Sequence, residues 1–226
     1  MNTHLSKFAA FFLLSAVIIF SSCDKDDERT QANVMVVHAA PDASGVDVLI
    51  DNTQENTSPL TYRNNTGYFD VETGTRNIKI NATGTTTTLI NADAEFDKND
   101  YYSIFAIDSL DNISALVVVD DLSTPRDGEA HVRFLHLAQG APAVDVAVAS
   151  SGEVLFDNVA FKEGTGFMSV DAGTYNLDVR LAGTVTVSLV LPTMTFADGK
   201  SYTVYARGFL LGTGTQALGT EVIVNK

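Results

Sequence analysis

The chain lacks several residues on which binding and cross-linked proteins often depend. It has no Trp, a single Cys among 226 residues, and half as many basic as acidic side chains, 14 against 28. One thiol cannot form an intramolecular disulfide, so packing alone must hold the fold together, which domains of about 100 residues can achieve. The net charge of −14 at pH 7 argues against a nucleic-acid partner, because binding to phosphates needs basic patches.

The first 22 residues have the parts of an export signal. Lys7 supplies the basic start, the apolar stretch 8–20 follows, and two serines precede the only cysteine, Cys23. The stretch is too short to cross a bilayer of roughly 30 Å as a helix. This arrangement resembles a bacterial lipoprotein signal, in which the cysteine is acylated and becomes the first mature residue, although Phe20 stands where Leu is more usual. The alternative is an ordinary secretory signal that ends near a cysteine.

Acylation at Cys23 would give the protein a membrane anchor without a transmembrane helix, because two or more acyl chains hold a protein stably on a bilayer. The run that follows the cysteine resembles the surface-export signal of Bacteroidota lipoproteins and consists of Asp24, Lys25, Asp26, Asp27 and Glu28. We therefore expect a lipid-anchored protein on the outer face of the outer membrane. The alternatives are a plain solvated acidic tether and a periplasm-facing protein.

The rest of the chain repeats itself. Residues 34–51 align with 132–149, which places His38 over His136 and Asp47 over Asp145. The same register continues through 67–80 with 166–179, and through 96–106 with 196–206. After the signal (1–22) and an acidic tether (23–31), we therefore predict two homologous domains, repeat 1 (32–122) and repeat 2 (129–226), joined by a linker (123–128) of turn-forming residues.

Each repeat is predicted to be all-β. Short runs rich in Val, Ile, Thr, Tyr and Phe alternate with Gly, Asn and Asp turns at a spacing of about 8–12 residues. Beyond the leader, no apolar stretch has helical periodicity of useful length. Seven or eight short strands in each repeat favour two tandem antiparallel β-sandwiches, immunoglobulin-like in the broad sense.

Two tyrosines refine this prediction. Tyr102 and Tyr202 each open a late strand after a polar turn, which is typical of a tyrosine corner, where a buried phenol bonds to upstream backbone. The spacing from Asp198 to Tyr202 fits this motif, whereas Lys98 breaks the pattern in repeat 1.

These motifs together resemble a known family. The opening V-x-V-x-H-A-x-P-D-A-x-x-V-D-V, the G-T-x-N turn and the late Y-x-x-x-A strand are similar to those of the domain of unknown function 4397 family. Repeat 2 departs from the opening at 139–141. The resemblance implies a secreted or envelope bacterial protein, often with tandem domains, and no established activity.

The repeated His and Asp residues are the first candidates for chemistry. His38 and Asp47 are nine residues apart, as are His136 and Asp145, and on a hairpin such residues could pair as a structural latch between the first two strands. A metal site would need three or four ligands. A catalytic pair would need a nucleophile oriented by a third group, and no serine occurs at matching positions of the repeats. We therefore assign no catalytic residue, metal or cofactor.

The sequence offers two further candidate binding sites. The acidic segment 93–100 could offer oxygen ligands to Ca²⁺, but it lacks the glycine turn of an EF-hand, so a solvated loop is expected. Glycan binding would have to rely on tyrosines in place of Trp, namely Tyr62, Tyr68, Tyr101 and Tyr205. The sequence favours a non-catalytic binding or structural module with a protein or glycan partner. The alternatives are a glycan-binding accessory protein and an unrecognised hydrolase.

Overall fold

The computed structural model describes residues 30–226. The signal, Cys23 and the acidic run 24–28 lie outside the described residues. Within them, no helix is long and apolar enough to cross a membrane.

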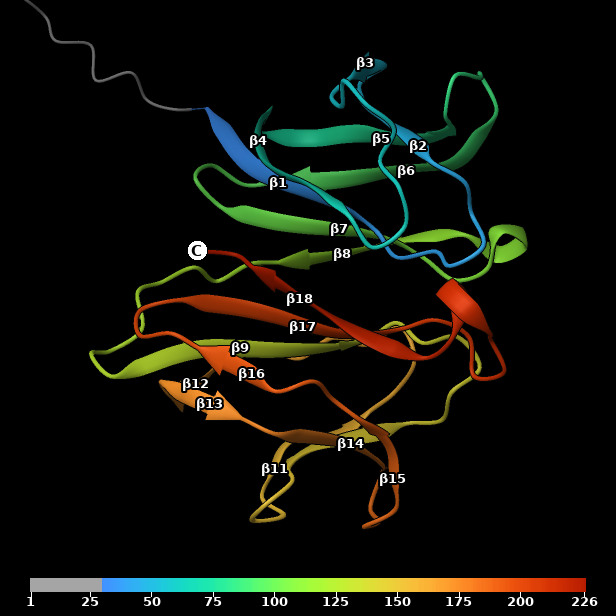
Figure 1. Cartoon of the computed structure of the whole chain (residues 1–226). Helices are drawn as coiled ribbons and strands as arrows, with labels where there is room; N and C mark the ends of the chain where they lie inside the picture. The colour runs from blue at the N-terminus through green and yellow to red at the C-terminus, as the bar shows by residue number, and fades with distance from the viewer. Residues whose placement is uncertain (1–29) are drawn as a thin grey trace, which may run out of the picture.

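The described chain is all-β, as predicted, and strands of the two repeats do not mix within any sheet there. In repeat 1, one sheet has the order β4 (Asn65–Glu72), β1 (Gln31–His38), β7 (Tyr101–Ile107), β8 (Ser114–Val119). The other has the order β3 (Thr53–Gln54), β2 (Val46–Ile50), β5 (Gly74–Ala82), β6 (Thr88–Phe96). The two sheets form a sandwich, in the upper half of Figure 1.

Repeat 2 follows the same plan. One sheet has the order β12 (Met168–Asp171), β9 (Glu129–His136), β17 (Ser201–Arg207), β18 (Gly219–Val224). The other has the order β11 (Val154–Val159), β10 (Val144–Val148), β14 (Leu177–Leu181), β15 (Val187–Val190). A short pair joins β13 (Gly173–Tyr175) to β16 (Met194–Phe196), and two 3₁₀ turns, η1 (Leu110–Asn112) and η2 (Gly214–Gln216), precede β8 and β18.

One strand pair in each repeat differs from a purely antiparallel sandwich. β1 lies parallel to β7, and β9 lies parallel to β17. These strands are far apart in the sequence, so the intervening strands provide the long connection that a parallel pair requires. As a result, β1 and β7 finish at the same end of their sandwich, and so do β9 and β17.

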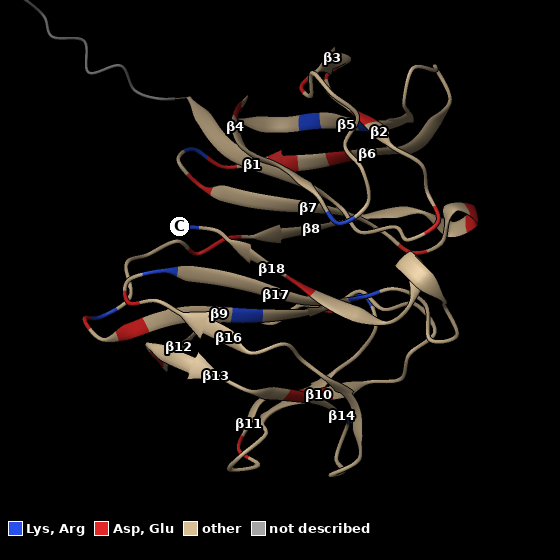
Figure 2. Ribbon diagram, in the orientation of Figure 1, with Lys and Arg blue, Asp and Glu red and all other residues tan. Residues whose placement is uncertain are grey.

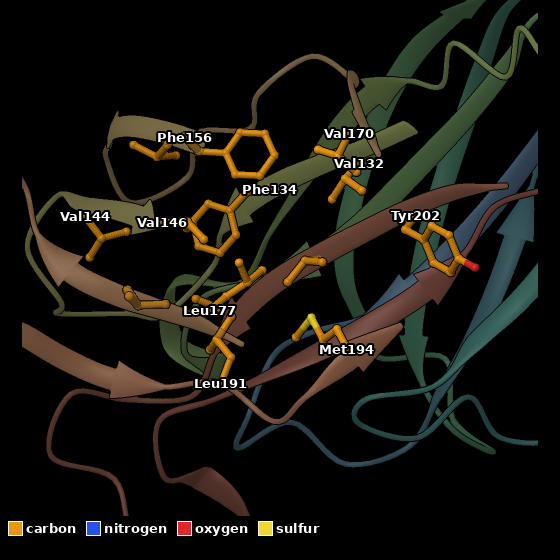
Figure 3. Packing of buried hydrophobic residues seen from close by; sticks show 14 of the residues in the cluster. Val132, Phe134, Val144, Val146, Phe156, Val170, Leu177, Leu191, Met194 and Tyr202 are labelled. Carbon is orange, nitrogen blue, oxygen red and sulfur yellow. The ribbon is translucent and has the colours of Figure 1, made fainter. Parts of the chain in front are cut away.

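Alternating side chains build three apolar cores. Val34 and Val36 of β1 face the core of repeat 1, whereas Met35 and Val37 face a separate cluster that also contains residues of repeat 2. Repeat 2 has its own core, which includes Phe134, Phe156 and Met194 and in which the rings of Phe134 and Phe156 are stacked (Figure 3). The sheets that contain β1 and β9 are therefore buried on both faces, and we call them the inner sheets.

The inner sheets meet at a seam between the repeats. Its apolar part includes Met35, Val37, Phe105, Leu135 and Tyr205, all fully or almost fully buried. Because apolar burial drives such association, the two sandwiches form one stacked body.

The tyrosine corner is present in both repeats. The hydroxyl of Tyr102 accepts a hydrogen bond from the backbone N–H of Asp97 at 2.9 Å, and that of Tyr202 accepts one from Ala197 at 3.0 Å. Lys98 does not disturb the motif, because the bond goes to backbone.

Candidate functional site

The same end of both repeats carries the loops that follow the two histidines. Near the start of β7 and β17, Ser103 and Thr203 join one polar cluster at the seam. In the middle, the rings of Phe105 and Tyr205 lie 5.7 Å apart. At the far end, Lys162 Nζ lies 2.7 Å from Asp108 Oδ2. The parallel strands β1 and β7 of repeat 1 and β9 and β17 of repeat 2, which we call the inner strands, therefore all run in the same direction (Figure 1).

We name the two ends of the molecule by what lies there. The tether end is where residue 30 enters β1. The loop end is where β1, β7, β9 and β17 finish. The loop end is formed by 39–45, 61–64, 108–113, 137–143, 160–167 and 208–218.

The histidines lie at the loop end but do not pair with the aspartates, so the predicted latch is wrong. His38 Nε2 lies 2.9 Å from the carbonyl oxygen of Ser44, and His136 Nε2 lies 2.9 Å from that of Pro142. A carbonyl can only accept, so Nε2 of each ring carries the hydrogen and donates it. Each imidazole thus closes the loop that follows its own strand.

Asp47 and Asp145 instead anchor turns. Asp47 accepts hydrogen bonds from the N–H of Gly84 at 2.9 Å and the hydroxyl of Thr83 at 3.2 Å. Asp145 accepts bonds from the N–H groups of Asn158 and Gly183 at 2.8 and 2.9 Å. The latch fails because β1 and β2 belong to different sheets, so a nine-residue spacing does not place the two side chains on a hairpin.

Burial determines the charge state of both histidines. The side chains of His38 and His136 are fully or nearly fully buried, and this burial lowers the pKa of each imidazole below its ordinary value, because the charged form loses its water. The bonds to carbonyls oppose this effect only in part. Both rings therefore favour the neutral form, which suits a structural donor.

Charged contacts join the repeats at the loop end. Glu221 receives two guanidinium groups, from Arg63 at 2.5 Å and from Arg207 at 2.8 Å. Arg63 and Lys162 occupy aligned positions and share a left-handed backbone, with φ of 76° and 70°. Each directs its charge to the opposite repeat. The sequence alignment missed these contacts because their acidic partners, Glu221 and Asp108, are not aligned with each other.

A buried polar cluster holds the other end of the seam. Arg133 is the one Lys or Arg on β9, seen as its blue stretch in Figure 2, and forms an ion pair with Asp120. Arg133 Nε also donates to Thr203 at 2.8 Å, and its guanidinium lies 4.6 Å from the ring centroid of Phe167. Asp120 accepts further bonds from Ser103 at 2.6 Å and from a tyrosine hydroxyl.

That hydroxyl belongs to Tyr68, which places two of the glycan candidates inside the seam. Tyr68 donates to Asp120 at 2.5 Å and accepts from Asn225 at 2.9 Å. Tyr205 is fully buried. Rings used in this way are not open stacking platforms for sugars.

The acidic segment 93–100 does not form the expected loop, because its first four residues belong to β6. Asp93 accepts a bond from Asn77 at 2.8 Å, and Glu95 bonds to Thr75, both across to β5. Among the described residues, no group of three or more His, Cys, Asp or Glu side chains could hold a metal ion.

The loop end of repeat 2 also contains a small apolar cavity of about 70 Å³. Residues of both sheets of repeat 2 line it, and the lining includes His136, Pro142, Leu189, Leu210 and Leu218. Beside it, Leu211 is 92% exposed. The loop end therefore combines ion pairs between the repeats, a small apolar cavity and an exposed leucine.

Comparison with known proteins identifies the family but no activity. No curated protein matches the chain. Among solved structures, it is similar to the C-terminal domain of AlgF from P. aeruginosa, with 16% identity, a TM-score of 0.31 and coverage of 44% of this chain and 99% of that one. It is also similar to the CBMbc module (family CBM26) of Eubacterium rectale Amy13K, solved with maltoheptaose, with 10% identity, a TM-score of 0.26 and coverage of 85% and 95%.

The Bacillus anthracis TIE protein is a third similar structure, with 8% identity, a TM-score of 0.27 and coverage of 86% of this chain and 44% of that one. Such low TM-scores support no inference about ligand. The family model named "Domain of unknown function (DUF4397)" matches twice, at residues 32–147 and 146–226. The chain therefore belongs to the DUF4397 family, as a tandem of two of its domains.

Proposed function

We propose that this protein is a surface-exposed lipoprotein of the outer membrane, anchored through Cys23, that works as a non-catalytic binding module. The observation that carries the proposal is the shared direction of the inner strands. Because β1 begins where the tether ends and spans about 26 Å at 3.3 Å per residue, an anchor at Cys23 would leave the loop end as the end of the domains farther from the attachment point. Binding residues are often found on loops held by a rigid scaffold.

The chemistry of the loop end supports binding over catalysis. Its two histidines are engaged with backbone carbonyls and favour the neutral form. Arg63 and Lys162 form ion pairs with Glu221 and Asp108 of the opposite repeat, which fixes the two repeats together at this end. The proposed partner is a protein or glycan outside the cell.

Surface exposure can be tested with a single introduced thiol. In the acylated protein Cys23 has no free thiol, so Leu211→Cys would provide one reactive group at the loop end. We expect a membrane-impermeant maleimide to label this variant on intact cells. Ala147→Cys, at a fully buried position, is the matched control and should stay unlabelled.

Labelling of Leu211→Cys only after the outer membrane is permeabilised would place the protein on the periplasmic side instead. Anchoring is tested separately by Cys23→Ser, which should release the protein from the membrane fraction. Retention of that variant in the membrane would contradict the lipid anchor.

A further inference from the structure

Exposed apolar side chains concentrate on the edges of the sheets. Of the eleven large apolar residues that are exposed in the described chain, seven lie on edge strands. They are Val117 and Val119 on β8, Val154 on β11, Val187 and Val190 on β15, and Val222 and Val224 on β18. An edge strand also presents unpaired backbone groups, so an apolar edge is a template for another strand.

β18 has the geometry that such pairing needs. It is the last strand of its inner sheet, paired only with β17. The N–H of Asn225 donates to the carbonyl of Ser201 at 2.8 Å, so in an antiparallel ladder the alternate residues Ile223 and Glu221 also face β17. The N–H and C=O groups of Val222 and Val224 therefore point to the free edge.

A groove of about 470 Å³ runs beside this edge. β18 lines one side with Val222 and Val224, and the other side includes Met194 and Phe196 of β16. Val222 and Val224 stand opposite Val204 and Tyr202 of the repeat 2 core, yet they are 43% and 60% exposed. The groove is open because β15 ends at Val190 and the chain passes through Pro192 before the short β16.

We propose that the β18 edge binds an extended segment of another protein as an added antiparallel strand. The backbone of the segment would pair with Val222 and Val224. Every second side chain of the segment would enter the groove, so these positions must be apolar. The net charge of −14 favours a segment with Lys or Arg at the remaining or flanking positions.

A second copy of this chain is the less suitable occupant, an argument that rests on the proposed anchoring. β18 runs from the loop end to the tether end, since Gly219 pairs with Arg207 and Val224 pairs with Tyr202. An antiparallel β18 from a second copy would place that copy's tether at the opposite end, away from the shared membrane. Two copies of a chain this acidic also repel each other.

The test uses the whole chain in lipid nanodiscs and short random peptides displayed on phage as the probe. We expect enriched peptides with apolar residues at alternate positions and basic residues between or beside them. The double variant Val222→Lys/Val224→Lys should weaken peptide binding about tenfold or more, because charges on an edge block strand addition. Val187→Lys/Val190→Lys, with the same charge change on another edge strand, is the matched control and should bind normally.

Hydrogen exchange gives the structural readout. Bound peptide should slow exchange of the backbone amides of Val222 and Val224, which lack a partner strand on that side. Val224→Pro is a second variant that removes one outward N–H without adding charge, and it should also weaken binding. It keeps the test decisive if the lysine pair does not fold.

Three results would overturn the proposal. They are failure to enrich any peptide over the Val222→Lys/Val224→Lys chain, equal binding by that variant, and unchanged exchange at β18 with peptide bound. If the wild-type chain self-associates and the lysine pair abolishes this association, the occupant of the β18 edge is a second copy. That result would reject the proposal that the occupant is a segment of another protein. A chain that proves not to be anchored can be assayed identically in solution, so failure of the proposed localisation is told apart from failure of the strand site.

Discussion

His136 is the residue whose role the structure changes most. Its ring holds the loop 137–143 through the carbonyl of Pro142 and accepts the N–H of Ala138 at 3.3 Å. We expect His136→Ala to lower the free energy of unfolding by about 1–3 kcal/mol, because it leaves a buried carbonyl without a donor. Urea unfolding measures this loss.

His136→Gln is the control, since its amide can donate to the same carbonyl, and it should recover part of the stability. A His136→Ala variant that is as stable as the wild type would show that the bond to Pro142 contributes nothing.

The buried histidines also predict a pH dependence. Burial lowers the pKa of both His38 and His136 below the ordinary value of 6.5, so the unfolded chain takes up their protons at a higher pH than the folded chain does. Stability is therefore fully present above about pH 7 and falls as the pH drops through 6.5 toward the lower folded values. Urea unfolding at about pH 7.5 and 5.5 should show this decrease.

The variant His38→Gln/His136→Gln removes both groups, so its stability should change less between the same two pH values. An equal decrease in wild type and variant would assign the pH dependence to other residues.

At the residue scale, contacts close in sequence were predictable and distant ones were not. The tyrosine corners join residues five positions apart, so the local pattern around Tyr102 and Tyr202 was sufficient. The partners of His38 and Asp47 depend on which sheet each strand joins, and side-chain spacing alone does not determine that.

At the scale of elements, the loop 208–218 that follows β17 packs the backbone at its start tightly against the backbone at its end. Gly208 has φ of 93°, and a Cβ there would collide with the backbone carbonyl of Ala217. Gly199 has a similar φ of 70° but open space around it. We expect Gly199→Ala to cost about 1–2 kcal/mol from left-handed strain alone.

Gly208→Ala should cost about 1–3 kcal/mol more, the added price of overpacking, measured by urea unfolding of the two variants side by side. Equal losses would mean that the loop moves aside freely and that the loop end is less rigid than the structure indicates.

Strand alternation was enough to predict two sandwiches, but it did not predict strand direction. Apolar alternation identifies faces and is the same for parallel and antiparallel neighbours, so the parallel pairs β1–β7 and β9–β17 were missed. The four consecutive apolar residues 34–37 were the available signal of double burial, because a strand covered on both faces reads as a continuous apolar run.

At the scale of the whole molecule, the two repeats contribute different residues to the seam at aligned positions. Met35 of repeat 1 aligns with Arg133 of repeat 2, and Asp120 occupies the place that Asn225 has after the last strand. Arg133→Met alone should cost about 3–5 kcal/mol, because it leaves the Asp120 carboxylate buried without a cation. Asp120→Asn alone should be costly for the converse reason.

The double variant Arg133→Met/Asp120→Asn gives both halves of the seam the same pair of residues and leaves no unpaired charge. We expect it to be more stable than either single variant in urea unfolding. A double variant whose loss equals the sum of the two single losses would show that Arg133 and Asp120 act independently.

The seam itself was the largest feature that sequence analysis missed. A sequence with two similar domains and a short linker is compatible with two domains that do not contact each other or with one stacked body. The aligned position that changes from Met35 to Arg133 was the one visible hint, since a guanidinium inside a buried strand requires a partner, and that partner lies in the other repeat.

The shared direction of the inner strands gives the seam a further consequence. Two identical chains meeting through these sheets would show every substitution twice, once on each side. In the tandem each substitution is made once, so the aligned residues Arg63 and Lys162 have different acidic partners. For the same reason, the apolar cavity described above lies at the loop end of repeat 2, beside an exposed leucine. Covalent joining thus lets a two-fold scaffold present two unlike halves to one partner.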